Sequence, residues 1–279
     1  MTVQFSPVFD AQVRGNDAFS IKALDLSQLA ELGCPVLAVD EFRARGTPFP
    51  PHPHAGFSAV TYVFEDSHSG LRSRTSLGDD VVIGPGGIVW TEAGRGVIHH
   101  ELPAEADREL HGLQIFVNLC AKNKLVAPRM LRLASEEVPE WRSAAGDSVR
   151  VVVGSFEPLS SPLMPAEPFT LLDVQLSRAT SFNVPEDHFT LVYVLGGSIL
   201  IRAGGRRQKV TNGRGIALYG GTGQAIFNCL EAAHFVLLMG NAIHEPLVID
   251  GPFIMNQRSE IEAAAERYRA GAMGELASI

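Results

Sequence analysis

Four side chains that can bind a metal ion occur as two pairs, and the members of each pair are two residues apart. The first pair stands in a His-Pro-His segment and the second in His-His-Glu. Successive side chains of a β-strand point to opposite faces, so both members of a pair can share one face. Three imidazoles and one carboxylate suit Fe(II), Mn, Ni, Cu or Zn. If the two segments lie side by side, the spacing predicts one metal site with four ligands: His52, His54, His99 and Glu101.

Each pair taken alone has a simpler explanation. In a chain with nine histidines, His52 and His54 could be half-buried strand residues bonded to nearby backbone. The second pair, at the same spacing, favours the metal site. The prolines around His52 would hold that pair rigid or protect a strand edge. We expect His100 to face away from the site and His111 to be a buried core histidine.

The rest of the sequence offers no second set of ligands at strand spacing. His188, His234 and His244 stand alone, so we expect no metal site in the second part of the chain. Neither a glycine-rich nucleotide motif nor a GxSxG motif is present. These absences disfavour nucleotide-binding proteins and serine hydrolases.

Short strand-like segments separated by glycine-rich turns surround the candidate ligands and predict an antiparallel barrel or sandwich. The proline-rich segment before His52 belongs at a sheet edge, because proline cannot donate a ladder hydrogen bond. Residues 122–146 are charged and contain proline, as is typical of a connector. We therefore expect an all-β protein with an N-terminal domain at 1–130 that holds the metal and a C-terminal domain at 147–279 without a metal.

Two helices and one tight hairpin are also predicted. A short helix should cover residues 25–32 and end at Gly33. A C-terminal helix should begin at a capping box formed by Ser259 and Glu262 and end at Gly271, serving as a packing element. Gly204 and the glycine after it predict a hairpin turn with exposed charge.

Composition restricts the partners and the compartment. The hydrophobic fraction of 46% and the charged fraction of 19% are those of a globular protein. The net charge of −8 disfavours direct nucleic-acid binding, so a partner should be a protein. Three separated cysteines indicate thiols in a reducing compartment. Without a signal-like N-terminus or a long apolar stretch, we expect a cytoplasmic protein that does not enter a membrane.

Several spaced motifs resemble the pirin family. They are His-Pro-His-x-Gly-Phe at 52–57, Trp-x-x-Ala-Gly-Arg-Gly-Val-Ile-His-x-Glu at 90–101, Leu-His-Gly-Leu-Gln-x-x-Val-Asn-Leu at 110–119 and Gly-Pro-Phe-x-Met-Asn at 251–256. The resemblance implies a bicupin, in which two cupin-type β-sandwich or barrel domains lie face to face and Fe(II) usually occupies the first. The family's ligand pattern falls on the same four residues. Ala55 and Ser58 depart from the Arg and Glu common in the family, and we expect both to flank the pocket mouth.

The resemblance implies two functions. One is a metal-dependent dioxygenase of the quercetin 2,3-dioxygenase type, acting on a small aromatic or enediol substrate. In that case Glu101 is a ligand and the catalytic general base. The alternative is a non-enzymatic, iron-dependent redox-sensing regulator that acts through a protein partner. The third interpretation is a cupin that has kept its fold and lost its chemical activity.

Overall fold

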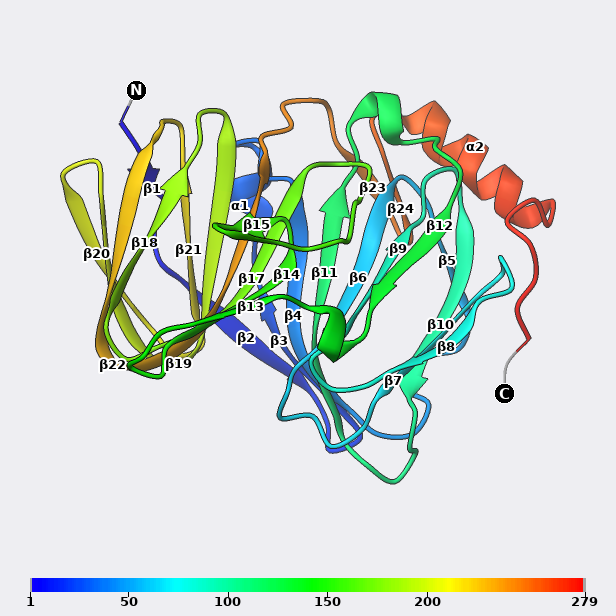
Figure 1. Cartoon of the computed structure of the whole chain (residues 1–279). Helices are drawn as coiled ribbons and strands as arrows, with labels where there is room; N and C mark the ends of the chain where they lie inside the picture. The colour runs from blue at the N-terminus through cyan, green and yellow to red at the C-terminus, as the bar shows by residue number, and fades with distance from the viewer. Residues whose placement is uncertain (1, 278–279) are drawn as a thin grey trace.

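The computed structural model describes residues 2–277, and almost all of its regular structure is β-strand, as the sequence predicts (Figure 1). In chain order the strands up to residue 133 are β1 (Gln4–Phe5), β2 (Phe9–Gly15), β3 (Phe19–Leu24), β4 (Val36–Ala44), β5 (His52–His54), β6 (Phe57–Val63), β7 (Leu71–Thr75), β8 (Asp80–Ile83), β9 (Ile88–Glu92), β10 (Val97–Pro103), β11 (Leu110–Asn118) and β12 (Arg129–Leu133). The later strands are β13 (Glu140–Arg142), β14 (Ser148–Val153), β15 (Ser155–Phe156), β16 (Leu159–Ser160), β17 (Phe169–Leu176), β18 (Ala179–Val184), β19 (His188–Ala203), β20 (Arg206–Thr211), β21 (Arg214–Tyr219), β22 (Gly223–Asn241), β23 (Val248–Asp250) and β24 (Phe253–Met255). The helices are α1 (Ser27–Ala30), α2 (Arg258–Arg269) and two short 3-10 helices at Ala121–Asn123 and Ser135–Glu137.

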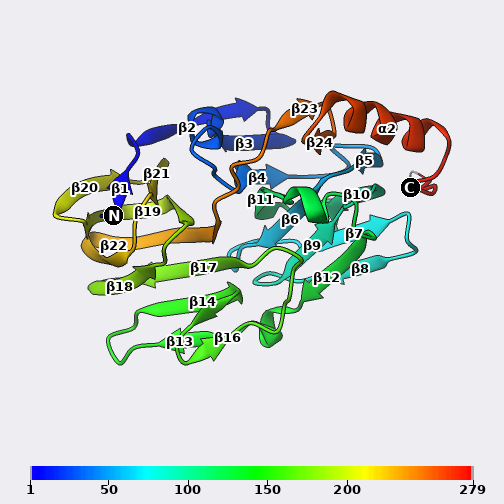
Figure 2. The same cartoon turned by 90° about the horizontal axis from the view of Figure 1, so that it is seen from above.

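Two facing sheets in the first half of the molecule, β3 to β12, enclose the predicted site (Figure 2). One sheet has the order β12-β9-β6-β11-β4-β3, and the other has the order β5-β10-β7-β8. Strand β5 lies at the edge of the smaller sheet and pairs with β10 alone, as its prolines predict. That antiparallel pairing places His99 directly opposite His52.

The second half, β13 to β22, continues the larger sheet. Strand β2 pairs with β3 on one side and with β21 on the other, which joins the two halves through backbone hydrogen bonds. A single core between the halves takes buried side chains from both, among them Tyr62, Trp90, Phe169 and Val236. This arrangement is the pair of packed cupin domains that was expected.

Both terminal segments lie against the opposite half. Strand β1 pairs with β21, so the N-terminus belongs to the second half's sheet. At the other end, Phe253 of β24 bridges to Ala55, and Ile261 of α2 packs into the same cluster as Ile98 of β10. The domain limits at 130 and 147 stay a prediction. The N-terminal segment packs against the second half and the C-terminal segment against the first half, so each of these contacts joins parts of the chain from the two sides of the limits.

The region 122–146 is more regular than the expected connector. It contains β12, which pairs with β9 in the first half, and β13, which pairs with β14 in the second. Long-range backbone pairing thus overrides its charged, proline-containing composition, and each end of the segment extends one half's sheet.

The C-terminal helix is present, but its cap differs from the prediction. Glu260 accepts hydrogen bonds from the backbone N–H groups of Gln257 and Asn256, so the capping box begins at Gln257 and Ser259 lies inside the helix. Gly271 follows the helix with a φ of +70°, as predicted. The shorter helix α1 also forms, with Gly33 beyond its end at a φ of +85°.

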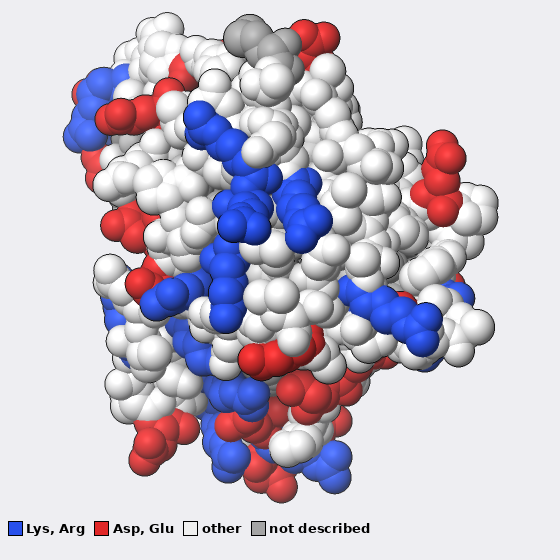
Figure 3. All heavy atoms as spheres, turned by 90° about the vertical axis from the view of Figure 1, so that its left-hand side faces the viewer, with Lys and Arg blue, Asp and Glu red and all other residues white. Residues whose placement is uncertain are grey.

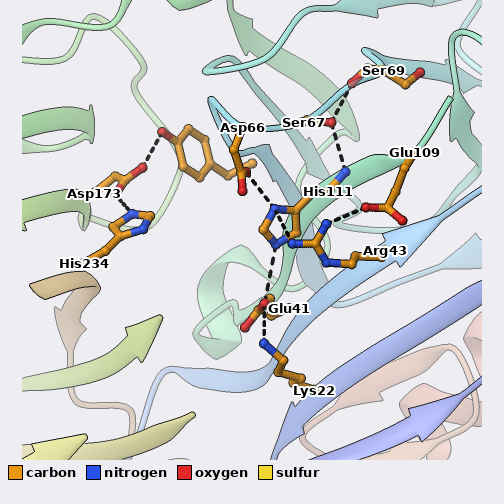
Figure 4. Close-up of polar contacts among 11 residues, drawn as sticks. Lys22, Glu41, Arg43, Asp66, Ser67, Ser69, Glu109, His111, Asp173 and His234 are labelled. Atoms are coloured by element: carbon orange, nitrogen blue, oxygen red, sulfur yellow. Dashed lines mark hydrogen bonds and ion pairs between the residues drawn. The ribbon is translucent and has the colours of Figure 1, made fainter. Parts of the chain in front are cut away.

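Buried polar side chains connect the two halves (Figure 4). The Tyr62 hydroxyl donates to Asp173 over 2.8 Å, and His234 lies 2.6 Å from the other oxygen of Asp173.

His111 lies between Asp66, at 2.7 Å, and Glu41, at 3.4 Å. His111 is therefore a buried core histidine with polar partners, as predicted.

A band of lysine and arginine side chains crosses the outer face of the second half (Figure 3). Strand β20 contributes the exposed Arg206, Arg207 and Lys209 to this side of the molecule. The tight turn before β20 is the predicted glycine hairpin, with φ angles of +56° and +77° at Gly204 and Gly205. None of the helices in residues 2–277 is long and apolar enough to cross a membrane.

Candidate metal centre

Three of the four predicted ligands converge at one point. Ligand atoms of His52, His54 and His99 all lie within 4.8 Å of one another. The Nε2 atoms of His52 and His99 are 3.0 Å apart, which follows from their direct pairing across β5 and β10. His54 and His99 are 5% and 3% exposed, so the cluster lies inside the protein. The predicted convergence of these two strands is confirmed.

Burial favours the neutral form of His54 and His99, and a backbone hydrogen bond orients the ring of His52. Nδ1 of His52 donates to the Pro50 carbonyl over 2.9 Å, which leaves the lone pair on Nε2, the atom that points into the cluster. Burial, together with the neighbouring His52 ring, lowers the pKa of His54 to about 3. Burial also lowers the pKa of His99 well below its usual range. Neutral imidazole is the form that binds metals.

Glu101 lies in the same cavity but outside the three-histidine cluster. Its carboxylate accepts hydrogen bonds from Thr61, over 2.6 Å, and from Ser73, over 3.2 Å. Burial raises the pKa of Glu101 to about 7, although these two hydrogen bonds act in the opposite direction. Neither Thr61 nor Ser73 could be selected from the sequence. Ser73 lies opposite Glu101 on the neighbouring strand β7, and Thr61 reaches Glu101 from β6 in the facing sheet.

The cluster opens into a cavity of about 370 Å³. Its wall is mainly apolar and aromatic, and it includes Phe19, Phe49 and Phe116. A cavity of this size and lining is suited to a small aromatic molecule. Apart from the histidines and Glu101, its polar lining residues are Asp40 and Gln114. Gln114 lies within a motif recognised from the sequence, but neither residue was identified as part of the site.

The structure bears on two predictions about residues that neighbour the proposed ligands in sequence. Ala55 and Ser58 are both fully buried and do not line this cavity, so the prediction that they flank its mouth is wrong. The C-terminal segment covers Ala55, since Phe253 bridges to it. His100 belongs neither to the cluster nor to the cavity lining, as predicted, and it is buried at 2% exposed.

Comparison with known proteins identifies the family. The pirin sequence model matches residues 12–117, and the model of the pirin C-terminal cupin domain matches residues 171–274. A Pseudomonas aeruginosa protein named as a candidate quercetin 2,3-dioxygenase is 34% identical over 86% of this chain and 86% of its own. Rat pirin is 34% identical, over 84% of this chain and 81% of its own.

Solved structures show the same fold. A structure titled quercetin 2,3-dioxygenase from Acinetobacter baumannii superposes with a TM-score of 0.86 at 24% identity, covering 99% of this chain and 100% of that one. The order of the motifs, the two packed cupin domains and the extent of these matches agree, and the chain belongs to the pirin family.

Proposed function

We propose that this chain is a metal-dependent dioxygenase of the quercetinase type. Fe(II) is the proposed metal, and a flavonol or a related aromatic enediol is the proposed substrate. The observation that carries this proposal is the convergence of His52, His54 and His99 at the wall of an apolar cavity of about 370 Å³. The name of the Pseudomonas aeruginosa relative supports the same reaction class. Glu101 is the proposed fourth ligand.

The residues fit a transition metal of the Fe(II) class. The Nε2 atoms of His52 and His99 face each other at 3.0 Å, and the ligand atoms of the three histidines lie within 4.8 Å of one another. An ion at this point would accept a lone pair from each neutral imidazole. A set of nitrogen donors with one carboxylate also accommodates Mn, Ni, Cu or Zn. Which of these metals the protein binds must therefore be determined by metal analysis.

The protein's own groups have distinct roles in this proposal. When bound, Fe(II) supplies open coordination positions and redox chemistry with O₂. Glu101 lines the same cavity as the three histidines and accepts the proton of a substrate hydroxyl, which is the role of a general base. Thr61 and Ser73 hold the carboxylate in place. The aromatic wall packs against the substrate rings and excludes water.

Oxygen consumption tests the proposal directly. Iron-loaded protein should consume O₂ with quercetin, and Glu101→Gln should lower kcat by about 100-fold or more, as expected for loss of a general base. His54→Ala should abolish stoichiometric metal binding. If the protein carries one metal per chain and consumes no O₂ with quercetin or related enediols, the dioxygenase proposal is wrong. A regulatory role through a protein partner, which the resemblance to the pirin family also implies, stays a prediction.

A further inference from the structure

A row of three polar side chains crosses the larger sheet of the first half at the cavity. Thr61 of β6 lies opposite Gln114 of β11, and Gln114 lies opposite Asp40 of β4. Residues paired directly across adjacent strands point to the same face of a sheet. Thr61 bonds to Glu101 at one end of the row, and Gln114 and Asp40 both line the cavity. The row therefore runs from the metal centre across the cavity wall.

Asp40 is the unusual member of this row. Its neighbours along β4 on the same face, Phe42 and Ala44, are apolar, and so is Ile21 on the adjoining strand. Among residues 2–277, nothing forms a hydrogen bond or ion pair with its carboxylate. Burial raises the pKa of Asp40, although Arg14 acts in the opposite direction. Because Asp40 lines the cavity, its carboxylate is placed to accept a hydrogen bond from a bound molecule.

Gln114 differs from Asp40 because protein groups lie within hydrogen-bonding distance of both its oxygen and its nitrogen. Its nitrogen donates to the Val60 carbonyl over 3.1 Å, and its oxygen lies 3.0 Å from the Thr61 hydroxyl, whose single hydrogen has Glu101 as its nearer acceptor. Gln114 therefore has a role in holding Thr61 beside Glu101. Asp40 has no such role and is free to accept a hydrogen bond from a molecule inside the cavity.

The spacing of the row sets the length of that molecule. Adjacent strands lie about 4.8 Å apart, so Asp40 is two strand spacings, or about 10 Å, from Thr61. A fused or linked pair of aromatic rings spans this distance. One end would lie at the metal centre and the other at Asp40.

We propose that Asp40 is a specificity-determining residue that accepts a hydrogen bond from a phenolic hydroxyl at the end of the substrate remote from the metal centre. This inference rests on the proposed function for the orientation of the substrate. It narrows the substrate class from small aromatics to planar polyphenols with a second, distal hydroxyl. Flavonols without a distal hydroxyl leave the Asp40 carboxylate desolvated and unpaired, and they bind more weakly.

Equilibrium binding without turnover tests this role. Iron-loaded protein is titrated anaerobically with 3-hydroxyflavone, 3,4′-dihydroxyflavone and 3,7-dihydroxyflavone, and Kd is obtained from the ligand absorbance. At least one dihydroxyflavone should bind wild type about 10-fold or more tightly than 3-hydroxyflavone, as a hydrogen bond to a charged acceptor implies. Asp40→Leu should bring the Kd values together, and Asp40→Asn should leave a smaller preference. Asp17→Asn, which changes an exposed aspartate in the same region, should behave as wild type.

The outcomes separate this proposal from the dioxygenase itself. Equal Kd values for all three flavonols in wild type overturn the role of Asp40, and so does a preference that survives in a folded, metal-loaded Asp40→Leu protein. The role of Asp40 is also overturned if none of the three flavonols binds to the wild-type protein. Oxygen consumption does not enter this measurement, so a protein that prefers the distal hydroxyl and consumes no O₂ would contradict the reaction and leave the recognition intact.

Discussion

At the scale of single residues, the Thr61 hydroxyl determines how Glu101 is held. Its one hydrogen has two acceptors within reach, Glu101 at 2.6 Å and Gln114 at 3.0 Å. The shorter contact goes to the carboxylate, where a hydrogen bond to a charged group is stronger than one to a neutral amide. Thr61 is 1% exposed, so water cannot replace its hydroxyl. The position of Glu101 therefore depends on a residue forty positions away in sequence.

Thr61→Val tests this dependence, because valine keeps the shape of threonine and removes the hydroxyl. Loss of a group that orients a metal ligand typically weakens metal binding by about 10- to 100-fold. We expect a loss of that size for Fe(II), measured by competition with a chelator. Thr190→Val is the matched control, since Thr190 is also buried but its hydroxyl has no partner in the described part of the chain. Equal Fe(II) affinity in both variants would show that Thr61 does not support the site.

Some residues of the site could be found from the sequence, and others could not. The period of two along a strand is a local property, and it was enough to select His52, His54 and His99. Glu101 followed from the same period, but its hydrogen-bond partners depend on which strands pair and in which register. Asp40 enters the cavity for the same reason, through pairing of β4 with β11. The spacing of residues within one segment does not show with which distant strand, or in which register, that segment pairs.

At the scale of elements, the C-terminal segment holds the turn after His54. Gly56 has a φ of +84°, and a Cβ at this position would lie 1.9 Å from the Ile254 carbonyl oxygen. Lys124 fixes the contact, since its ammonium donates to the carbonyls of Gly56 and Ile254 and to the side chain of Asn118. Burial lowers the pKa of Lys124 to about 8, so the group is still mainly protonated at pH 7.

Lys124→Met should release this contact. It leaves buried carbonyl groups without donors, each at a cost of about 1–3 kcal/mol, so we expect the free energy of unfolding to fall by about 3 kcal/mol. Chemical denaturation measures the loss, and hydrogen exchange should increase at β24. Lys122→Met is the control, because Lys122 is exposed two residues earlier in the chain. A Lys124→Met protein as stable as this control would mean that the buried ammonium contributes nothing net.

The elements themselves were only partly predictable. The short strands and α2 follow local patterns, but the capping residue moved from Ser259 to Gln257 because Glu260 reaches back to the backbone there. The strands β12 and β13 were missed because they add to sheet edges that distant parts of the chain create. Their sequences alone resemble a connector.

At the scale of the whole molecule, the two halves share buried polar contacts as well as an apolar core. Asp173 of the second half accepts from Tyr62 of the first and also contacts His234. Tyr193 makes the reverse connection, donating to Glu41 of the first half over 2.7 Å. Buried polar contacts of this kind specify one arrangement of the halves, since any other would leave these groups unsatisfied.

The pair formed by His234 and Asp173 should make stability depend on pH. Burial lowers the pKa of His234, but the hydrogen bond to Asp173 and the charges of Asp173, Asp66 and Glu41 outweigh it, so the net pKa is raised. Because the pKa of His234 is higher in the folded protein than in the unfolded protein, protonation of His234 stabilises the fold. This stabilisation is complete below the unfolded pKa of about 6.5, and it is lost as the pH rises through the folded pKa.

His234→Gln should therefore destabilise the protein more at pH 5.5 than at pH 9. The His234 side chain is 33% exposed, so the expected difference is only about 1 kcal/mol, or about 2 °C in Tm. Thermal unfolding of wild type and variant at both pH values measures it. His188→Gln is the control, because the Nδ1 atom of His188 donates to the Glu186 carbonyl of its own turn and not to a carboxylate. If the gap between wild type and His234→Gln is the same at both pH values, the charge on His234 plays no part in joining the halves, and the contact acts only as a neutral hydrogen bond.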